Sequence, residues 1–239
     1  MLTSVRSLMA ATVFAGAAFA AAPAMAQDES PISISANVAI TSEYRFRGVD
    51  LSGGDIAVQG GIDVGLPAGF YVGTWASSLD EDTVGFGHTE VDVYGGWTTS
   101  LGDTVTFDVG VVAYLYPNAG PGEFDAIEFY SSIGAELGPA AVTVGVAYSP
   151  EQDSLGGEDN FYIYSDVGFG IPGTPVTLNG HLGYTDGFLT YTNDSKAFDW
   201  SVGATVGIGE ILSLNVSYIG AEGDIVAPDY DFVDDTVVL

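Results

Sequence analysis

The chain has 239 residues, of which 32 are Asp or Glu and only four are Lys or Arg, so its formal net charge is −28. This acidity excludes the basic surface that nucleic-acid binding requires, and the lack of cysteine excludes disulfides, metal–thiolate sites and thiol catalysis. Apolar residues make up 47% of the chain and aromatic residues 12%, which favours a packed β structure over disorder.

The first 26 residues have the pattern of a secretory signal peptide. Arg6 supplies a positive start, a short apolar run covers 8–22, and 24–26 is Ala-Met-Ala, a small-x-small cleavage pattern. The run is too short and too rich in alanine for a membrane helix, and no later segment has ~18 unbroken apolar residues. We therefore expect 1–26 to be a cleaved signal peptide and 27–239 to form one exported domain.

The mature sequence alternates apolar and polar residues in segments along its length, beginning at 32–47. There, most even-numbered residues are apolar and most odd-numbered ones are polar, and successive side chains of a strand point to opposite faces. The same alternation predicts eleven further strands, at 56–66, 70–77, 90–97, 105–116, 127–137, 142–149, 161–171, 176–185, 198–208, 212–218 and 232–239.

Short and long connections alternate between these segments. Five short turns, such as 67–69 and 138–139, alternate with six longer loops, such as 78–88 and 150–159. This is the pattern of a membrane barrel with short periplasmic turns and longer extracellular loops. We predict an all-β fold, a transmembrane antiparallel up-and-down β-barrel of about twelve strands, located in the bacterial outer membrane.

The alternative fold is a soluble β-sandwich, whose strands also alternate. Against it, the eleven charged residues in the interior of the first eleven predicted strands all share the polar parity. A charge facing lipid near the midplane costs ~2–4 kcal/mol, so lipid enforces this parity more strictly than water does. The aromatic residues of the apolar parity, which we expect to form girdles at the membrane interfaces, are Tyr44, Phe46, Phe70, Trp97, Tyr148, Phe161, Phe169, Tyr184, Phe198, Trp200 and Tyr218.

Several different short motifs lie along the mature chain. They are Tyr44 followed by Phe46-Arg47-Gly48, then Gln59-Gly60-Gly61, Gly69-Phe70-Tyr71-Val72-Gly73-x-Trp75, Glu90-x-Asp92-x-Tyr94-Gly95-Gly96, Tyr114-x-Tyr116-Pro117, Tyr164-x-Asp166, His181-Leu182-Gly183-Tyr184 and Asp199-Trp200. Together they resemble the TorF family of proteobacterial outer-membrane porins, whose function is itself inferred from their barrel. The resemblance implies location and fold rather than a substrate. Such barrels usually end in an aromatic residue, whereas this chain stops at Val237-Val238-Leu239, which leaves either a truncated sequence or a short last strand.

Twelve strands enclose a lumen of intermediate size. With strands ~4.8 Å apart and tilted by ~40° from the barrel axis, the backbone radius is roughly 12 Å. This size lies between that of eight-stranded barrels, whose interior is filled, and that of sixteen-stranded barrels, which hold wide channels. The lumen would hold either a narrow passage for ions or small solutes, or a plug. The titratable residues expected to line it and set its selectivity are Glu43, Arg45, Arg47, Asp63, Glu90, Asp92, Asp108, Glu128, Asp166, His181 and Asp199. Because carboxylates dominate this set, we predict a passive pore with a weak cation preference.

Arg45 and Arg47 hold half of the cations of the chain, two residues apart. We expect them near the outer end of the first strand, facing the lumen. There each guanidinium would donate forked hydrogen bonds to carboxylates of neighbouring strands, for example Asp63. Two interpretations stay open. The arginines brace and neutralise an acidic wall, or they form a constriction that binds an anionic solute group.

The alternative to a pore is a structural, ligand-binding or adhesive barrel with a plugged lumen, acting through the acidic loops at 80–82, 151–159 and 229–235. These loops lack EF-hand spacing, and we predict no metal site and no cofactor. Catalysis needs a nucleophile, a base and an orienting group; only His88 and His181 could serve as histidine bases, and we predict that the protein is not an enzyme. The expected partners are outer-membrane lipid, lipopolysaccharide, and small solutes or ions.

Overall fold

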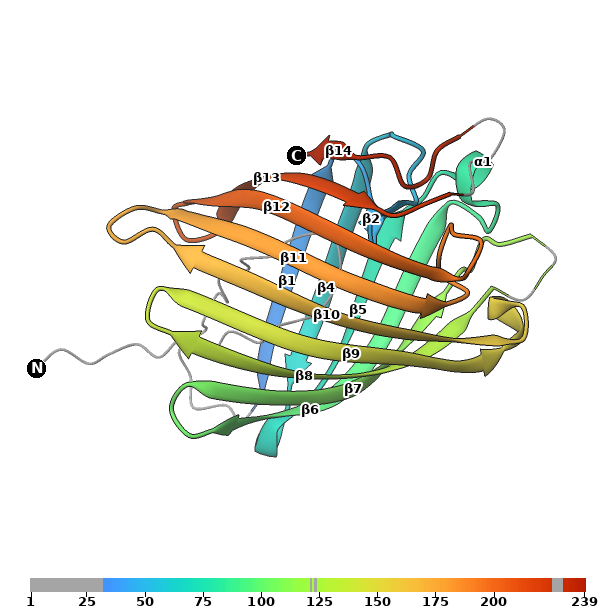
Figure 1. Cartoon of the computed structure of the whole chain (residues 1–239). Helices are drawn as coiled ribbons and strands as arrows, with labels where there is room; N and C mark the ends of the chain where they lie inside the picture. Colours follow the sequence, from blue (N-terminus) through green and yellow to red (C-terminus); the bar gives the residue numbers. More distant parts are fainter. Residues whose placement is uncertain (1–31, 121, 123, 225–229) are drawn as a thin grey trace, which may run out of the picture.

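The computed structural model describes residues 32–120, 122, 124–224 and 230–239. The predicted signal peptide lies outside these residues. The described chain forms a twelve-stranded antiparallel sheet in which each strand pairs with the next, and the sheet rolls into a nearly closed barrel (Figure 1). The two edge strands meet where the Ser42 amide donates to the Leu239 carbonyl at 3.0 Å. The predicted fold class and strand number are confirmed.

The strands of the barrel are β1 (Ser33–Thr41), β4 (Ala57–Gly65), β5 (Phe70–Ser78), β6 (Thr89–Leu101), β7 (Val105–Leu115), β8 (Ala126–Leu137), β9 (Ala140–Gln152), β10 (Glu158–Gly170), β11 (Val176–Gly187), β12 (Lys196–Ile208), β13 (Leu212–Ala221) and β14 (Thr236–Val238). Short helical turns lie in the connections, namely η1 (Pro67–Gly69), α1 (Glu81–Val84) and η2 (Asp153–Leu155). Across the described residues, no helix is long and apolar enough to cross a membrane.

Large apolar side chains cover the outside of all twelve strands. In β1, for example, Ile34 is 67% and Val38 80% exposed, whereas the alternating residue Asn37 faces inward and is half-buried. Contiguous apolar surface on this scale is a membrane or protein interface, and the outward apolar parity is that of a lipid-facing barrel. The β-sandwich alternative is wrong, because this face does not pack against a second sheet.

Most of the predicted girdle aromatics lie on this outer face. Those that are well exposed are Phe70, Tyr148, Phe161, Phe169, Phe198 and Tyr218. The prediction is wrong for Tyr44 and Phe46. Tyr44 is buried inside the barrel and Phe46 packs there against Tyr114, with ring centroids 5.8 Å apart.

The reason is that the first strand ends earlier than predicted. β1 stops at Thr41, and the chain then turns into the barrel to form a two-stranded hairpin, β2 (Arg45–Phe46) and β3 (Val49–Asp50). At its tip, Arg47 and Gly48 have left-handed φ angles of 50° and 78°. A Cβ on Gly48 would lie closer than 3.0 Å to Ala221, so only glycine fits this turn. The alternation runs on through this segment, which is why it predicted one long strand.

The inside of the barrel differs between its two ends. We call the part next to the long connections the loop half and the part next to the short turns the turn half. Inward side chains of the loop half, such as Gln59, Glu90 and Tyr162, are buried. Those of the turn half, such as Asp63 and Asn179, are only half-buried.

Candidate functional site

Residues 43–52, which we call the inner hairpin, occupy the loop half of the lumen. Five of its side chains are at most 6% exposed, namely Tyr44, Arg45, Arg47, Asp50 and Ser52. The inner hairpin touches well-separated parts of the wall, since Tyr44 donates to Glu90 of β6 at 2.7 Å and Arg47 to Glu128 of β8 at 2.8 Å. It therefore crosses the lumen at this level.

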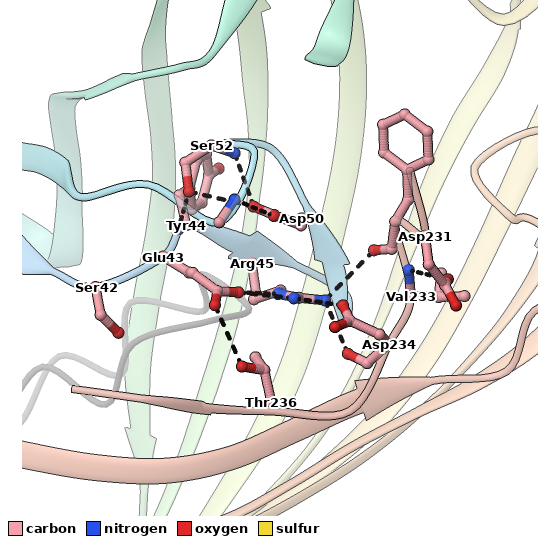
Figure 2. Close-up of polar contacts among 12 residues, drawn as sticks. Ser42, Glu43, Tyr44, Arg45, Asp50, Ser52, Asp231, Val233, Asp234 and Thr236 are labelled. Carbon is pink, nitrogen blue, oxygen red and sulfur yellow. Dashed lines mark hydrogen bonds and ion pairs between the residues drawn. The ribbon is translucent and has the colours of Figure 1, made fainter. Parts of the chain in front are cut away.

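Asp50 holds the inner hairpin in shape from within. Its carboxylate accepts from the amides of Ser52 at 2.8 Å and Gly54 at 2.7 Å, a local arrangement for which short acidic side chains are suited. The Ser52 hydroxyl in turn accepts from the Tyr44 amide at 2.8 Å (Figure 2). Tyr230 also donates its hydroxyl to Asp50. These bonds satisfy backbone donors of the inner hairpin and of Gly54 that follows it.

Arg45 ties the inner hairpin to the segment that precedes β14 (Figure 2). Its guanidinium donates to Glu43 Oε2 at 2.7 and 2.9 Å, to Asp234 Oδ1 at 2.8 Å and to the Asp234 carbonyl at 3.0 Å. Glu43 also accepts from the Thr236 hydroxyl at 3.2 Å. The guanidinium of Arg45, a planar group with several donors, thus joins two segments that lie almost 190 residues apart in the sequence.

Arg47 spans the lumen. One of its nitrogens, Nη2, lies 2.8 Å from both carboxylate oxygens of Glu128, and both side chains are buried. Its guanidinium carbon lies 4.0 Å from the ring centre of Tyr162 on β10, a cation–π distance. Glu128 further accepts from Tyr114 and Ser149, each at 3.1 Å. This geometry supports the bracing interpretation of the arginines.

The predicted partner of the arginines is wrong. Asp63 lies in the turn half and accepts a hydrogen bond from the Tyr94 hydroxyl. The strand pairing places Asp63 beside Gly73 and Tyr94, whereas the inner hairpin enters from the loop side. Alternation predicts which face a residue takes but not how deep an inserted segment reaches.

His181 joins Asp166 and Asp199 across three adjacent strands, β10 to β12. Its Nδ1 lies 2.6 Å from Asp166 Oδ1, and its Nε2 lies 2.9 Å from Asp199 Oδ1 and 2.8 Å from the Tyr162 hydroxyl. Both ring nitrogens are thus engaged. His88 is exposed in a loop and contacts the Thr89 hydroxyl at 2.8 Å.

Tyrosine hydroxyls donate hydrogen bonds to most of the inward carboxylates. The sequence analysis did not predict these bonds. Besides the contacts above, Tyr71 donates to Asp108 at 2.9 Å and Tyr116 to Glu90 at 3.0 Å. These hydroxyls thus satisfy carboxylates on the wall, while the Tyr130 hydroxyl bonds to that of Tyr71 at 2.7 Å.

Several of these rings lie over glycines of the next strand. A Cβ on Gly73, Gly96, Gly110 or Gly145 would come closer than 3.0 Å to the ring of Tyr94, Tyr71, Tyr130 or Tyr164, respectively. The rings therefore lie along the wall, because glycine leaves room for them there. The signal in the sequence was inward glycine and inward tyrosine on neighbouring strands, which becomes visible once the register is known.

Comparisons with known proteins show a bacterial family and no activity. The model of a family described as "Bacterial protein of unknown function (Gcw_chp)" matches residues 25–239. This bears out the coarser part of the family resemblance, a bacterial family of unknown function spanning the mature chain, while the porin activity implied by the TorF name stays a prediction. No curated protein is similar enough in sequence to count as a relative.

Among solved structures, the chain is similar to a refined porin structure at 14% identity and a TM-score of 0.41, covering 76% of this chain and 60% of that one. It is similar to OccAB3 of Acinetobacter baumannii at 10% identity and a TM-score of 0.44, and to OpdO of Pseudomonas aeruginosa at 15% and 0.41, covering in both cases 89% of this chain and 64% of the other. The chain thus spans less than two thirds of these proteins. Because the TM-scores are low, the architecture rests on the strand pairing of this chain.

Proposed function

We propose that this chain, which belongs to the bacterial family of unknown function Gcw_chp, is an outer-membrane channel for ions and small solutes that is narrowed by its own inner hairpin. The observation that carries the proposal is the combination of a lipid-type exterior with a charged, hydrogen-bonded interior that the inner hairpin crosses. Rings of charge inside a barrel act on ions that enter it.

The turn half supports a passage rather than a solid core. Its tyrosine rings lie along the wall over glycines, and its carboxylates keep contact with solvent; the Asp166 side chain is 45% exposed. A barrel serving only as a scaffold has no need to keep polar groups accessible, because filling the interior with apolar side chains would stabilise it more.

The charge distribution supports a cation preference. Both lumenal arginines are buried and paired with carboxylates, so they add little positive potential to a passing ion. The accessible charges are carboxylates, among them Asp63, Asp108 and Asp166. Such groups raise the local concentration of cations and lower that of anions.

The burial of the inner hairpin favours a second candidate, a permanently plugged barrel that acts through its loops. The two differ in what happens when the inner hairpin is removed. A channel conducts weakly with the inner hairpin and strongly without it, whereas a plugged barrel conducts only after removal.

The test is planar-bilayer recording on folded protein in a salt gradient. The wild type is compared with a variant in which 44–52 is replaced by a short Gly-Ser linker. Asp103→Asn, an exposed change on the turn side, is the control. We expect small cation-preferring currents from the wild type and the control, and larger currents from the deletion variant. Silent wild-type protein with a conducting deletion variant would favour the plug, and an anion-preferring reversal potential would contradict the selectivity.

A further inference from the structure

Both ring nitrogens of His181 face carboxylates on the neighbouring strands. Nδ1 lies 2.6 Å from Asp166 Oδ1 on β10, and Nε2 lies 2.9 Å from Asp199 Oδ1 on β12. A neutral imidazole has one N–H donor and one acceptor nitrogen, whereas the imidazolium has two donors. With both carboxylates ionised, only the imidazolium can donate to each of them, because the neutral ring would turn a lone pair toward one carboxylate.

The contacts of Asp199 fit the charged form of the ring. The Tyr162 hydroxyl lies 2.8 Å from His181 Nε2 and 3.2 Å from Asp199 Oδ1, so it can donate to the same carboxylate as the ring does. The other oxygen, Asp199 Oδ2, is buried and has no partner among the described residues. A buried carboxylate requires a counter-charge. Within the described part of the chain, His181 is the one basic side chain at ion-pair distance from Asp199.

The wall leaves room for this cluster at Gly183, two residues along β11 from His181 on the same face. A Cβ there would come closer than 3.0 Å to both the Tyr162 hydroxyl and Asp199 Oδ2. Glycine therefore lets these groups approach the imidazole from the strands on either side. The rings of Tyr162 and Tyr164 lie nearly parallel to the imidazole, at 25° and 22°. The site is thus arranged before any ion enters the lumen.

His181 has more contact with solvent than either lumenal arginine. Its side chain is 16% exposed, compared with 1% for Arg45 and 5% for Arg47. With a proton on the ring, His181 and its two carboxylates carry a net charge of about −1, and without it about −2, since each ionised carboxylate contributes one negative charge. A change of this size at a partly accessible site acts on the ions in the lumen.

We propose that His181 is a specificity-determining residue that carries a positive charge at neutral pH, bridges Asp166 and Asp199, and weakens the cation preference of the lumen. When the ring loses its proton, the cation preference rises. The role in selectivity rests on the proposed channel, whereas the charged bridge does not. The titratable and charged groups that face His181 in the described residues are Tyr162, Tyr164 and Asp166 of β10, Asp199 of β12 and, over the Tyr162 ring, Arg47 of the inner hairpin.

Nitrogen NMR of the full chain in detergent, with isotope-labelled histidine, tests the charge. The chain has two histidines, so His88→Gln, a change in an exposed loop, leaves the signals of His181 alone. We expect both ring nitrogens of His181 to carry a proton at neutral pH. A ring with one bare nitrogen would overturn the proposal, because any shared proton would then lie on a carboxylate.

Reversal potentials in a salt gradient test the effect on selectivity. His181→Gln removes the charge, and its ratio of cation to anion permeability at neutral pH should exceed that of the wild type a few-fold. His181→Arg keeps a positive charge and has donors for both carboxylates, so its ratio should stay close to that of the wild type. His88→Gln is the control and should also keep it. The wild-type ratio should rise over the pH range in which NMR shows His181 to lose its proton, and the ratios of His181→Gln and His181→Arg should not follow that range.

Two results would overturn the role in selectivity. One is an equal ratio in His181→Gln and the wild type. The other is an equal shift in His181→Gln and His181→Arg, which would show that distortion of the wall, and not charge, changes the permeability. A wild type that does not conduct would contradict the proposed function and with it this role, while the NMR signals alone would decide whether His181 forms the charged bridge.

Discussion

The two halves of the lumen are built from the same alternating strands but are filled in different ways. In the loop half, a segment of the chain folds inward and its charges pair with charges of the wall, as Arg47 does with Glu128. In the turn half, the wall itself carries tyrosines laid over glycines, and Asp166 stays partly exposed. The difference shows that one barrel can be crossed by paired charges at one end and kept polar and accessible at the other.

Pairing makes the loop half depend on individual contacts. A buried ion pair adds little to stability compared with an apolar pair, yet removal of one partner is severe because the other charge is left without compensation. An accessible carboxylate such as Asp166 keeps its hydration and can lose its partner with less effect. The same kind of change should therefore have a large effect at the loop end and a small one at the turn end.

The largest effect is expected for Arg47→Ala. It leaves Glu128 buried without its cation, which should lower the free energy of unfolding by ~3–5 kcal/mol. Urea unfolding of the barrel in detergent or lipid, followed by tryptophan fluorescence, measures the change. If the inner hairpin also loosens, the bilayer conductance of this variant should rise.

The double variant Arg47→Met/Glu128→Leu is its control. Because it removes both charges and keeps much of the side-chain volume, it should recover most of the stability lost in Arg47→Ala. A single variant as stable as the wild type would show that the loop half does not depend on this pair, and the contrast between the halves would disappear.

The second-largest loss of stability is expected for Gly145→Ala in the barrel wall. The new methyl group would occupy the position of the Tyr164 ring, so the ring has to swing into the lumen. Overpacking of this kind costs ~1–3 kcal/mol, measured by the same urea titration. The displaced ring should also narrow the passage and reduce conductance.

Gly180→Ala is the matched control, because a Cβ at that glycine meets nothing within 4 Å. It should unfold like the wild type and conduct like it. Equal behaviour of the two glycine variants would mean that the tyrosine rings are free to move, and that the turn half is not held open by the glycines.

A smaller effect is expected for Asp166→Asn, which tests the accessible charge of the turn half. A single charge acting through water contributes about 1 kcal/mol at close range, so the ratio of cation to anion permeability should fall a few-fold at most. Reversal potentials in a salt gradient measure it. Glu128→Gln, whose charge is buried and paired, should change this ratio less than Asp166→Asn does, and the opposite order would place the selectivity in the loop half.

Much of the barrel could be predicted because lipid imposes a strict rule on each residue. Every outward position of a strand such as β1 must be apolar, so Ile34 and Val38 reveal the strand, its faces and its lipid contact from sequence alone. The twelve strands and the alternation of short and long connections follow from that rule and from turn residues.

The interior could not be predicted to the same depth, because several arrangements satisfy the same alternation. The segment from Glu43 to Arg47 continues the pattern of β1, and contacts with residues far along the chain, such as Glu128 and Asp234, hold it in the lumen. The tyrosine–glycine pairs likewise depend on strand register, and a shift of one residue would turn every side chain to the other face.

The smallest effect is expected for Lys196→Ala at the loop-side rim, where Lys196 Nζ lies 3.7 Å from Asp186 Oδ2 and both side chains are 49% exposed. Water and salt screen such a pair, so its removal should change the free energy of unfolding by less than ~1 kcal/mol. The variant loses one cation, as Arg47→Ala does, and keeps the inner hairpin and the wall. If urea titration shows it to be as destabilised as Arg47→Ala, then loss of net charge from a very acidic protein, rather than burial of an unpaired Glu128, would account for both results.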